Sequence, residues 1–508
     1  MFRVLPLALA AALLVSLSAA SAAPAATFRI AIGIDPDTLD PIGTTTTTAG
    51  NVVDYVAEGL TRLEPSGKVV PHLAESWTIS EDGRQYTFKL RRGVTFHDGT
   101  PFDAAAVKWN LDRVADPNVK VPIRTPYPIE KTEVVDSHTI RVTLKHPFAP
   151  FIAGLSWTTA AMLSPEGVKK AGNDYANYPN IVGTGPYTLG ERKRGESITL
   201  NGFPKYWGQK PYYDQVLVRI VPEAATRESL ILAGQVDLMI LPPIADIPAL
   251  QRNPAVKVLL APSDRTIFIA INTNKLKDRR VRQAINYAVD KSAIIKNVLF
   301  DAADVMDGPM APSLFGYCKV GEYGFEPQRA KQLLKEAGVP QGARIQLMHP
   351  TGRYVQDREA AQAIAGYLRE VGLDAQLTTT DWPTYIKTIM APPESNTTEL
   401  HLLGWAPAFL DASQQMAQFT SDNHPPKALA TSFYKNPEVD RLAAQAEQET
   451  DPEKRKDLYC QVSKLIWEDA PWLFLWVQRF PVVYSAKVTN VEALPNEKFW
   501  ALYARPAR

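Results

Sequence analysis

The feature that most constrains the fold of this chain is a regular alternation of short apolar segments and amphipathic helices that begins at residue 266. Residues 266–271 have the apolar run of a buried strand, and the apolar positions of 281–289 share one helical face. The alternation continues through the predicted strands 344–348, 373–379 and 399–403 and the predicted helices 327–338, 364–372, 438–449 and 452–468. Strands that alternate with helices predict an α/β region with a mostly parallel sheet.

The pattern is different before residue 265. A helix is expected from its cap at Asp103 to about Arg113. The segments that predict strands there are 27–34, 84–90, 94–96, 138–144, 197–201 and 215–221. The chain shows no internal repeat, and its 508 residues suggest about three domains or one large bilobal body.

Three loops of the second half are candidate ligand-binding segments, because ligands of open α/β sheets bind beyond the carboxyl ends of strands. The loops are 272–274, 349–354 and 404–411, after the predicted strands 266–271, 344–348 and 399–403. We therefore expect ligand-binding side chains in these loops.

Three side chains in these loops have suitable chemistry. Arg353 carries a planar guanidinium suited to a carboxylate, Trp405 offers a wide apolar face with one donor, and Asp411 can neutralise an ammonium. An amine, a carboxylate and an apolar wall are the requirements of a short zwitterionic peptide. The alternative interpretation is that Arg353 and Asp411 are solvated loop charges and that Trp405 belongs to the core.

The N-terminus has the pattern of a secretory signal peptide. Arg3 precedes an apolar stretch over residues 4–17, and small residues follow at 20–22. The expected leader is therefore 1–22, with cleavage at 22–26. The apolar stretch of about 14 residues is shorter than the roughly 20 of a spanning helix, and no cysteine follows it for lipid attachment. We expect an exported protein that is not lipid-anchored.

Export changes the interpretation of the two cysteines, Cys318 and Cys460. Thiols often pair in an oxidising compartment, and this pairing would close a long loop in the C-terminal half. Spacing does not show whether the two α-carbons approach, so two separate buried thiols remain the alternative. Two cysteines are too few for a four-cysteine zinc site.

Charge and motifs exclude several classes of function. The 55 basic residues balance 54 acidic ones, and loss of Arg3 with the leader leaves 54 of each. A neutral chain has no electrostatic reason to bind nucleic acid or an anionic membrane. The sequence contains no His-Glu-x-x-His, Gly-Lys-Ser phosphate loop or Gly-x-Ser-x-Gly motif, and its histidines show no ligand spacing. No motif therefore predicts a metal, a cofactor or a catalytic residue, and a hydrolase triad formed from residues distant in sequence stays open.

The most specific pattern lies over residues 74–99. It reads Ala-Glu-Ser-Trp-Thr-Ile-Ser-Glu-Asp-Gly over 74–83, followed by Tyr-Thr-Phe-Lys-Leu-Arg over 86–91 and Gly-Val-Thr-Phe-His-Asp-Gly over 93–99. Further agreement comes from 182–187, 206–207, 279–291 and 330–338. This pattern resembles extracellular solute-binding proteins of family 5, the peptide-, nickel- and glutathione-binding components of ABC importers. The resemblance runs from about residue 28 to about 485.

The resemblance implies a bilobal, periplasmic-binding-protein-like α/β fold with two interlobe crossings and an extra inserted domain. The expected parts are a first lobe of 27–66, 182–265 and 481–508, an inserted domain of 67–181 and a second lobe of 266–480. It also implies a periplasmic protein, expected to be a monomer, that encloses a small peptide by hinge closure. The expected partner is an ABC permease in the inner membrane.

Within the family, the glutathione-binding branch is the most similar, at residues 104–113, 161–165 and 425–440. Arg124 falls where that branch carries an arginine, which makes it a second carboxylate candidate. Arg353 resembles, within one position, an arginine that dipeptide-binding members use for the peptide carboxylate.

The chain departs from the family pattern at the amino-group site. Dipeptide and oligopeptide binders hold the peptide amino group with an Asp shortly after a Gly-Trp pair. The nearest match here is Ala408, and Asp411 lies three residues further on. Nickel is disfavoured because the histidines are scattered. Two functions therefore remain: a binding protein for glutathione-like ligands, dipeptides or oligopeptides, and a secreted hydrolase that acts on peptides or peptidoglycan.

Overall fold

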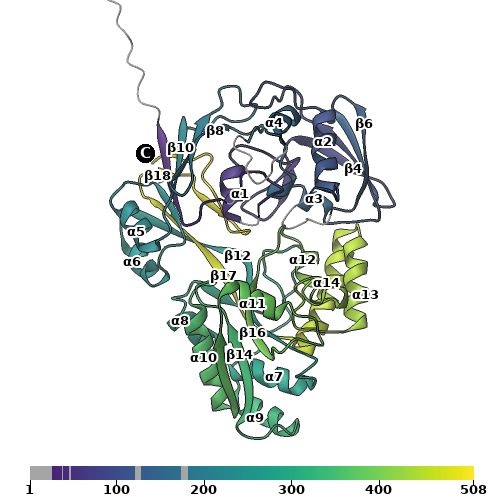
Figure 1. Cartoon of the computed structure of the whole chain (residues 1–508), viewed down its shortest axis with the longest axis vertical. Helices are drawn as coiled ribbons and strands as arrows, with labels where there is room; N and C mark the ends of the chain where they lie inside the picture. The colour runs from purple at the N-terminus through teal and green to yellow at the C-terminus, as the bar shows by residue number, and fades with distance from the viewer. Residues whose placement is uncertain (1–25, 37, 45–46, 120–126, 173–180, 508) are drawn as a thin grey trace, which may run out of the picture.

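One mixed sheet of eleven strands runs through both lobes of the computed structural model, which describes residues 26–36, 38–44, 47–119, 127–172 and 181–507 (Figure 1). The strands follow the order β15 (Leu373–Thr379), β14 (Ala343–His349), β16 (Leu400–Trp405), β12 (Val256–Ile271), β17 (Trp472–Ser485), β11 (Leu238–Ile240), β1 (Thr27–Ile32), β10 (Gln215–Ile220), β9 (Ser197–Gly202) and β8 (Tyr187–Lys193). The short β13 (Ala303–Val305) pairs with β17. The expected leader and Arg124 lie outside the described residues.

The long strands β12 and β17 are the two crossings between the lobes (Figure 1). Val256–Pro262 pairs with Arg479–Ser485 in the first lobe, and Thr266–Ala270 pairs with Trp472–Val477 in the second. The antiparallel register shifts between Pro262 and Thr266, so the ladder is interrupted where the chain passes between the lobes. This arrangement confirms the predicted bilobal fold with two crossings. The exact domain limits stay predictions.

The first lobe is built from both ends of the chain. Its core joins Phe28 and Ile30 of β1 to Val482 and Phe499 from the C-terminal segment. The helices of this lobe are α1 (Thr47–Val53), α5 (Ala224–Leu232) and α6 (Ile247–Arg252). Its short tail strands pair as β18 (Val488–Thr489) with β21 (Arg505–Pro506) and as β19 (Glu492–Leu494) with β20 (Lys498–Trp500). The last residues are therefore an integral part of this lobe.

The region predicted as an inserted domain has its own sheet, in the order β4 (Ala74–Ile79), β5 (Gln85–Leu90), β7 (Thr139–Leu144) and β6 (Ile129–Asp136). The main helix is α2 (Ala104–Ala115), and the Asp103 carboxylate caps it by accepting a bond from the Ala106 amide. The shorter elements are β3 (Val69–Pro71), α3 (Phe151–Gly154) and α4 (Pro165–Lys170), and β3 pairs with β2 (Thr61–Leu63), which lies before the predicted limit at residue 67. The predicted strand 94–96 is reduced to one isolated bridge between Thr95 and Pro101.

The second lobe corrects the prediction of a mostly parallel sheet. Strand β14 is parallel to β15 and β16, but β12 is antiparallel to both β16 and β17. The physical reason is the crossing itself, because one strand must carry the chain out of the first lobe and the other must carry it back. The helices are α7 (Arg279–Ala288), α8 (Lys291–Asn297), α9 (Pro327–Glu336), α10 (Asp357–Glu370), α11 (Trp382–Ile389), α12 (Ala412–Met416), α13 (Pro437–Gln448) and α14 (Pro452–Asp469).

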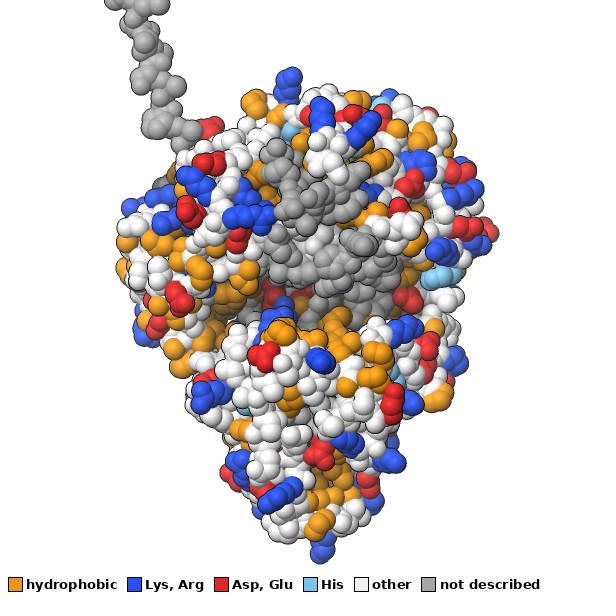
Figure 2. All heavy atoms as spheres, viewed as in Figure 1, with side chains coloured by type: hydrophobic (Ala, Val, Ile, Leu, Met, Phe, Trp, Pro, Cys, Tyr) orange, Lys and Arg blue, Asp and Glu red, His pale blue; other side chains and the backbone are white. Residues whose placement is uncertain are grey.

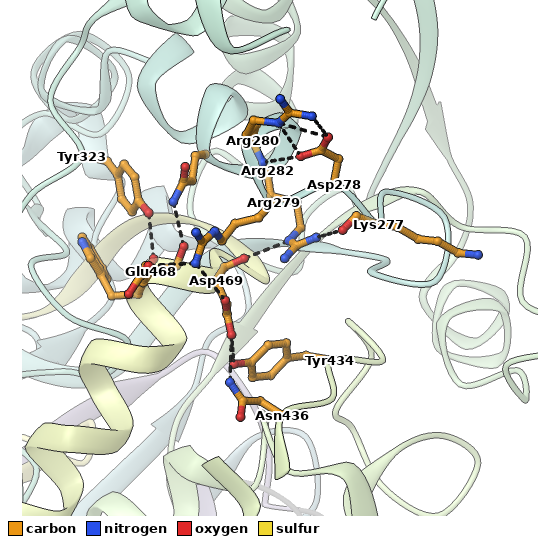
Figure 3. A network of polar contacts seen from close by, with 12 residues as sticks. Lys277, Asp278, Arg279, Arg280, Arg282, Tyr323, Tyr434, Asn436, Glu468 and Asp469 are labelled. Carbon is orange, nitrogen blue, oxygen red and sulfur yellow. Dashed lines mark hydrogen bonds and ion pairs between the residues drawn. The ribbon is translucent and has the colours of Figure 1, made fainter. Parts of the chain in front are cut away.

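A polar network fixes the end of α14, from which β17 departs (Figure 3). The Asp469 carboxylate accepts bonds from the Tyr434 hydroxyl (2.6 Å) and the Asn436 amide (3.0 Å). On α7, Arg282 donates to the Asp469 carbonyl (2.9 Å), and Arg279 pairs with Glu468 (2.8 Å). The network therefore sets where the second crossing strand begins.

The two lobes contact each other directly. Phe409, in the loop after β16, is only 2% exposed and packs in the apolar core of the inserted region. The Ala149 amide of that region donates to the carbonyl of Glu447 on α13 (3.0 Å). These contacts describe an arrangement in which the lobes are closed upon each other.

The visible face of both lobes carries basic and acidic side chains interspersed with one another (Figure 2). This mixture is expected from the near balance of 55 basic and 54 acidic residues. Within the described part of the chain, no helix combines the length and the apolar composition needed to cross a membrane.

A buried histidine makes stability depend on pH. His401 on β16 lies with its Nε2 atom 2.8 Å from the Thr431 hydroxyl oxygen, and burial lowers the pKa of His401 to about 3. In the unfolded chain the His401 imidazole binds a proton near pH 6.5. The stabilisation that comes from the neutral, buried imidazole is therefore fully present above that pH, and it falls by about 1.4 kcal/mol per pH unit as the pH drops toward 3. When the pH is lowered from 7 to 5, the free energy of unfolding measured by urea denaturation should fall by about 2 kcal/mol more in the wild type than in His401→Asn. Equal losses in both proteins would contradict this assignment.

Candidate functional site

Two of the three predicted loops meet at one edge of the second-lobe sheet. The strands β14 and β16 are parallel, and the hydroxyl of Tyr354 in the loop after β14 donates to the carbonyl of Gly404 near the end of β16 (3.1 Å). A Cβ at position 404 would lie 2.6 Å from a ring carbon of Tyr354. Glycine is therefore required where the two loops touch.

The third loop, 272–274, lies at the opposite edge, so its prediction as part of the site is wrong. Strand β12 runs against β16, with Ile271 opposite Leu400 and Thr266 opposite Trp405. The part of β12 that borders the other two loops is therefore the part near Thr266, where the strand enters the second lobe. The signal in the sequence is the polar run 263–265, directly before the apolar strand.

The loop that carries Arg353 is organised by Asp357, at the start of α10. This buried carboxylate accepts bonds from the backbone amides of Gly352 (3.0 Å), Arg353 (2.9 Å) and Tyr354 (3.0 Å). The Arg353 side chain is exposed, and its guanidinium carbon lies 5.0 and 5.2 Å from the ring centres of Tyr354 and Trp382. Asp357 was not among the predicted residues.

Trp405 is partly a core residue and partly available for ligand contact. It is half-buried and packs against the apolar core of the second lobe. Its indole N–H donates to the carbonyl of Gln414 (3.2 Å). This hydrogen bond orients the ring, and the partly exposed face is the part that a ligand can contact.

Asp411 is held in a buried ion pair. The carboxylate is 2% exposed, and its two oxygens accept bonds from the two terminal nitrogens of Arg455 on α14, at 2.6 and 2.7 Å. The same carboxylate caps α12 through the Ser413 amide (3.0 Å). Because Arg455 already neutralises the charge, this geometry disfavours the predicted contact between Asp411 and a ligand ammonium. Sequence reasoning missed Arg455, which lies 44 residues away.

The first lobe, the inserted region and the tail together line a cavity. Trp157, Trp500 and Arg62 are among its walls. Lys498, whose side chain is 4% exposed, donates to Asp54 (2.7 Å) and lies 4.8 Å from the ring centre of Trp157. The cavity therefore combines aromatic surface with charged side chains, and none of these residues was predicted.

Glu58 forms the polar floor of this cavity. It accepts bonds from the Tyr206 hydroxyl (2.7 Å) and the Trp207 indole (2.9 Å). The Thr184 hydroxyl donates to it (2.8 Å), and the Nε2 atom of His72 lies 2.9 Å away. Burial alone would raise the pKa of Glu58, but the partners His72, Trp207 and Tyr206 lower it below its ordinary value. This carboxylate is thus fully engaged and joins the inserted region to the first lobe.

The crossing itself connects the loops to the cavity. Arg265, at the interruption of β12, forms a bidentate pair with Glu497 of the tail, at 2.7 and 2.5 Å. The Asp264 amide donates to the carbonyl of Pro495 (2.8 Å), and the next residue, Asn496, lines the cavity. The interlobe junction is therefore the place where all these parts converge.

Cys318 and Cys460 form a disulfide, with their α-carbons 5.2 Å apart. The bridge ties the segment before α9 to α14, which also carries Arg455. Among the described residues, no group of three histidine, cysteine or acidic side chains is arranged to hold a metal ion.

Removal of Asp411 tests its structural role. Asp411→Ala leaves the Arg455 guanidinium buried without its partner, so the free energy of unfolding should fall by about 3–5 kcal/mol in urea denaturation. Arg353→Ala is the control, because its exposed guanidinium forms no ion pair with the described residues and its loss should change stability by less than about 1 kcal/mol. The double variant Asp411→Leu/Arg455→Met should recover part of the loss. A small effect of Asp411→Ala alone would contradict the assignment.

Comparisons with known proteins agree with this architecture. The family model of the bacterial extracellular solute-binding proteins, family 5 Middle, matches residues 68–427. The glutathione-binding protein GsiB of Escherichia coli strain K12 is 32% identical over 476 residues, which cover 92% of each chain.

Solved structures extend the agreement to the whole fold. HbpA2 from Haemophilus parasuis aligns with a TM-score of 0.85 at 25% identity, over 95% of this chain and 100% of that one. The periplasmic binding protein DppA from Helicobacter pylori, in complex with the peptide STSA, aligns with a TM-score of 0.78 at 26% identity, over 95% of this chain and 98% of that one. With two lobes, two crossing strands and a family match over most of its length, the chain belongs to the extracellular solute-binding proteins of family 5.

Proposed function

We propose that this protein is the periplasmic binding protein of an ABC importer and that it captures a small peptide between its lobes. The observation that carries the proposal is the convergence at the crossing of β12 and β17, where β12 pairs with the strand that leads into loop 404–411 and its Arg265 binds Glu497 of the tail, while loop 349–354 contacts the end of that same strand. A ligand at this junction touches both lobes, so its binding energy favours closure.

The chemistry of the junction suits a zwitterionic ligand. Arg353 presents an exposed guanidinium backed by the rings of Tyr354 and Trp382, and it would pair with a ligand carboxylate. Arg124 is a second candidate for an acidic ligand group. The exposed part of Trp405 and the aromatic cavity walls supply apolar contact. Exclusion of water on closure strengthens each of these charge interactions.

The relatives support this ligand class. GsiB is named for glutathione, and the DppA structure contains a four-residue peptide, so glutathione-like ligands and short peptides are the first candidates. The alternative of a secreted hydrolase has no support from these relatives, which are binding proteins. Delivery to an inner-membrane permease, export through the 1–22 leader and a monomeric state complete the proposal.

Calorimetry with glutathione, dipeptides and Ni²⁺ tests the function. We expect saturable binding of a peptide ligand that is recovered intact, with the folded state stabilised by about 2.7 kcal/mol at a ligand concentration of 100 Kd. Absence of binding to every peptide, or hydrolysis that depends on this protein, would overturn the proposal.

The carboxylate site is tested by arginine removal. Arg353→Ala and Arg124→Ala should each weaken the binding of an acidic peptide by at least about 1.5 kcal/mol, roughly tenfold in Kd, because a charge-assisted hydrogen bond is lost. Arg344→Ala is the matched control, since its side chain is 87% exposed and it lies at the other end of β14. Amidation of the peptide carboxylate should remove the difference in affinity between each variant and the wild type. Unchanged affinity in both variants would exclude these arginines from the site.

A further inference from the structure

A long segment without regular structure lies beside the loop 404–411. Strand β13 ends at Val305 and α9 begins at Pro327, and the chain between them forms turns, bends and one isolated bridge. Segments of more than about 15 residues without helix or strand are uncommon in compact domains, so other contacts must fix this one. Its first part is held by the core of the second lobe, in which Leu314 is buried. The part that follows, residues 315–320, is called the strap below.

The strap holds the loop 404–411 through its backbone. The Phe315 amide donates to the carbonyl of Leu410 (3.1 Å), and the Phe315 carbonyl accepts a bond from the amide of Ala412 (2.9 Å). These two bonds form the isolated bridge between Phe315 and Asp411. Phe409 of the same loop is the side chain that packs in the core of the inserted region. The position of the strap therefore affects both the ligand-binding loop and the contact between the lobes.

On its other side the strap is tied to α14. Cys318 of the strap and Cys460 of the helix form the disulfide, which joins residues 142 positions apart. Gly316 has a φ of +89°, and a Cβ there would lie 2.5 Å from a ring carbon of Tyr459, the residue before Cys460. Glycine is therefore required for the close approach of the strap to the helix. The strap lies between α14 and the loop, with a covalent tie to the helix.

A second connection between α14 and the loop is independent of the disulfide. Arg455 of α14 pairs with Asp411, and its guanidinium carbon lies 4.9 Å from the ring centre of Phe315. This buried pair stays in place when the disulfide is broken, so the loop remains attached to the second lobe. Loss of the disulfide alone therefore loosens the strap and the loop without detaching them.

The disulfide lies at the surface, in a basic environment. Both cysteines are half-buried, so neither is enclosed in a core. Lys456 and Lys464 lie one helical turn before and one after Cys460, on the same face of α14, although Lys456 also pairs with Glu453 (2.8 Å). Cationic neighbours stabilise a thiolate and make it a better leaving group, which favours reduction of a disulfide by thiols.

We propose that the Cys318–Cys460 disulfide is a redox-sensitive tie that, through the strap, controls the order of the loop 404–411 and hence the affinity for the ligand. The inference rests on the proposed function of peptide capture. In the reduced protein the loop must be ordered when the ligand binds, and this ordering costs affinity.

The reductant that the proposal names is a dithiol. Its thiolate attacks one sulfur of the bridge and forms a mixed disulfide, while the other cysteine leaves as a thiolate and takes up a proton. The second thiol of the reagent then attacks the reagent's own sulfur in the mixed disulfide and releases the first cysteine. The products are two cysteine thiols and the oxidised, cyclic reagent.

Calorimetry on the oxidised and the reduced protein tests the tie. S-methylglutathione and alanyl-leucine are the probe ligands, because neither contains a thiol that could react with the bridge. The oxidised wild type should bind the tighter of these ligands at least about threefold more strongly than the protein reduced by dithiothreitol. The double variant Cys318→Ser/Cys460→Ser should bind like the reduced wild type and should not respond to dithiothreitol.

Hydrogen exchange on the ligand-free protein separates this role from general stabilisation. Loss of a disulfide lowers the stability of a folded protein in any case, so a lower thermal midpoint is not sufficient. The inference requires faster exchange of the amides of Phe315 and of residues 404–412 after reduction, with unchanged exchange in β5 of the inserted region as the control.

Three results would overturn this inference alone: a bridge that resists dithiothreitol until the protein unfolds, an unchanged ligand affinity after complete reduction, or unchanged exchange in 404–412. Failure of every peptide to bind the oxidised wild type would instead overturn the proposed function. The two failures are distinguishable, because hydrogen exchange reports the effect of the bridge on the loop without any ligand.

Discussion

The pairing of β12 with β17 is the constraint on which the rest of the structure depends. These strands belong to both lobes, and β16 of the second lobe pairs with β12 while β11 of the first lobe pairs with β17. The interruption between Pro262 and Thr266 breaks the ladder where the lobes join, so a change in angle there leaves the hydrogen bonds of either lobe intact. The crossing therefore provides both continuity of the sheet and a place to bend.

Charges buried around this junction are mostly neutralised within the protein. Asp411 with Arg455, Lys498 with Asp54, and Arg265 with Glu497 each connect segments that are far apart in sequence. Such pairs contribute little net stability but are costly to break, so they fix the geometry of the segments that they join. A ligand therefore meets a surface whose charges are already placed and balanced, and the exposed Arg353 differs from the rest in this respect.

Local sequence predicted those parts of the fold that depend on local periodicity. The alternation of strands and helices after residue 266 indicated the second lobe, and the 74–99 pattern indicated the family. The direction of β12 could not be read in this way, because it follows from the path of the chain between lobes, and the loop 272–274 was misplaced as a result. The partners of Asp411 and Glu58 were missed for a similar reason, since Arg455 and Tyr206 are 44 and 148 residues away and nothing in the local pattern marks them.

The position of the C-terminal segment has a consequence for the order in which the molecule is assembled. The Phe499 amide donates to the side chain of Asn51 across 448 residues, and β17 supplies the neighbour of β11 in the first lobe. Strands β13 to β16 and helices α7 to α14 come from one continuous stretch, and the second-lobe part of β17 follows directly after α14. The lobe that begins first along the chain is thus the one that finishes last, because its core stays open until the final residues of the polypeptide have arrived.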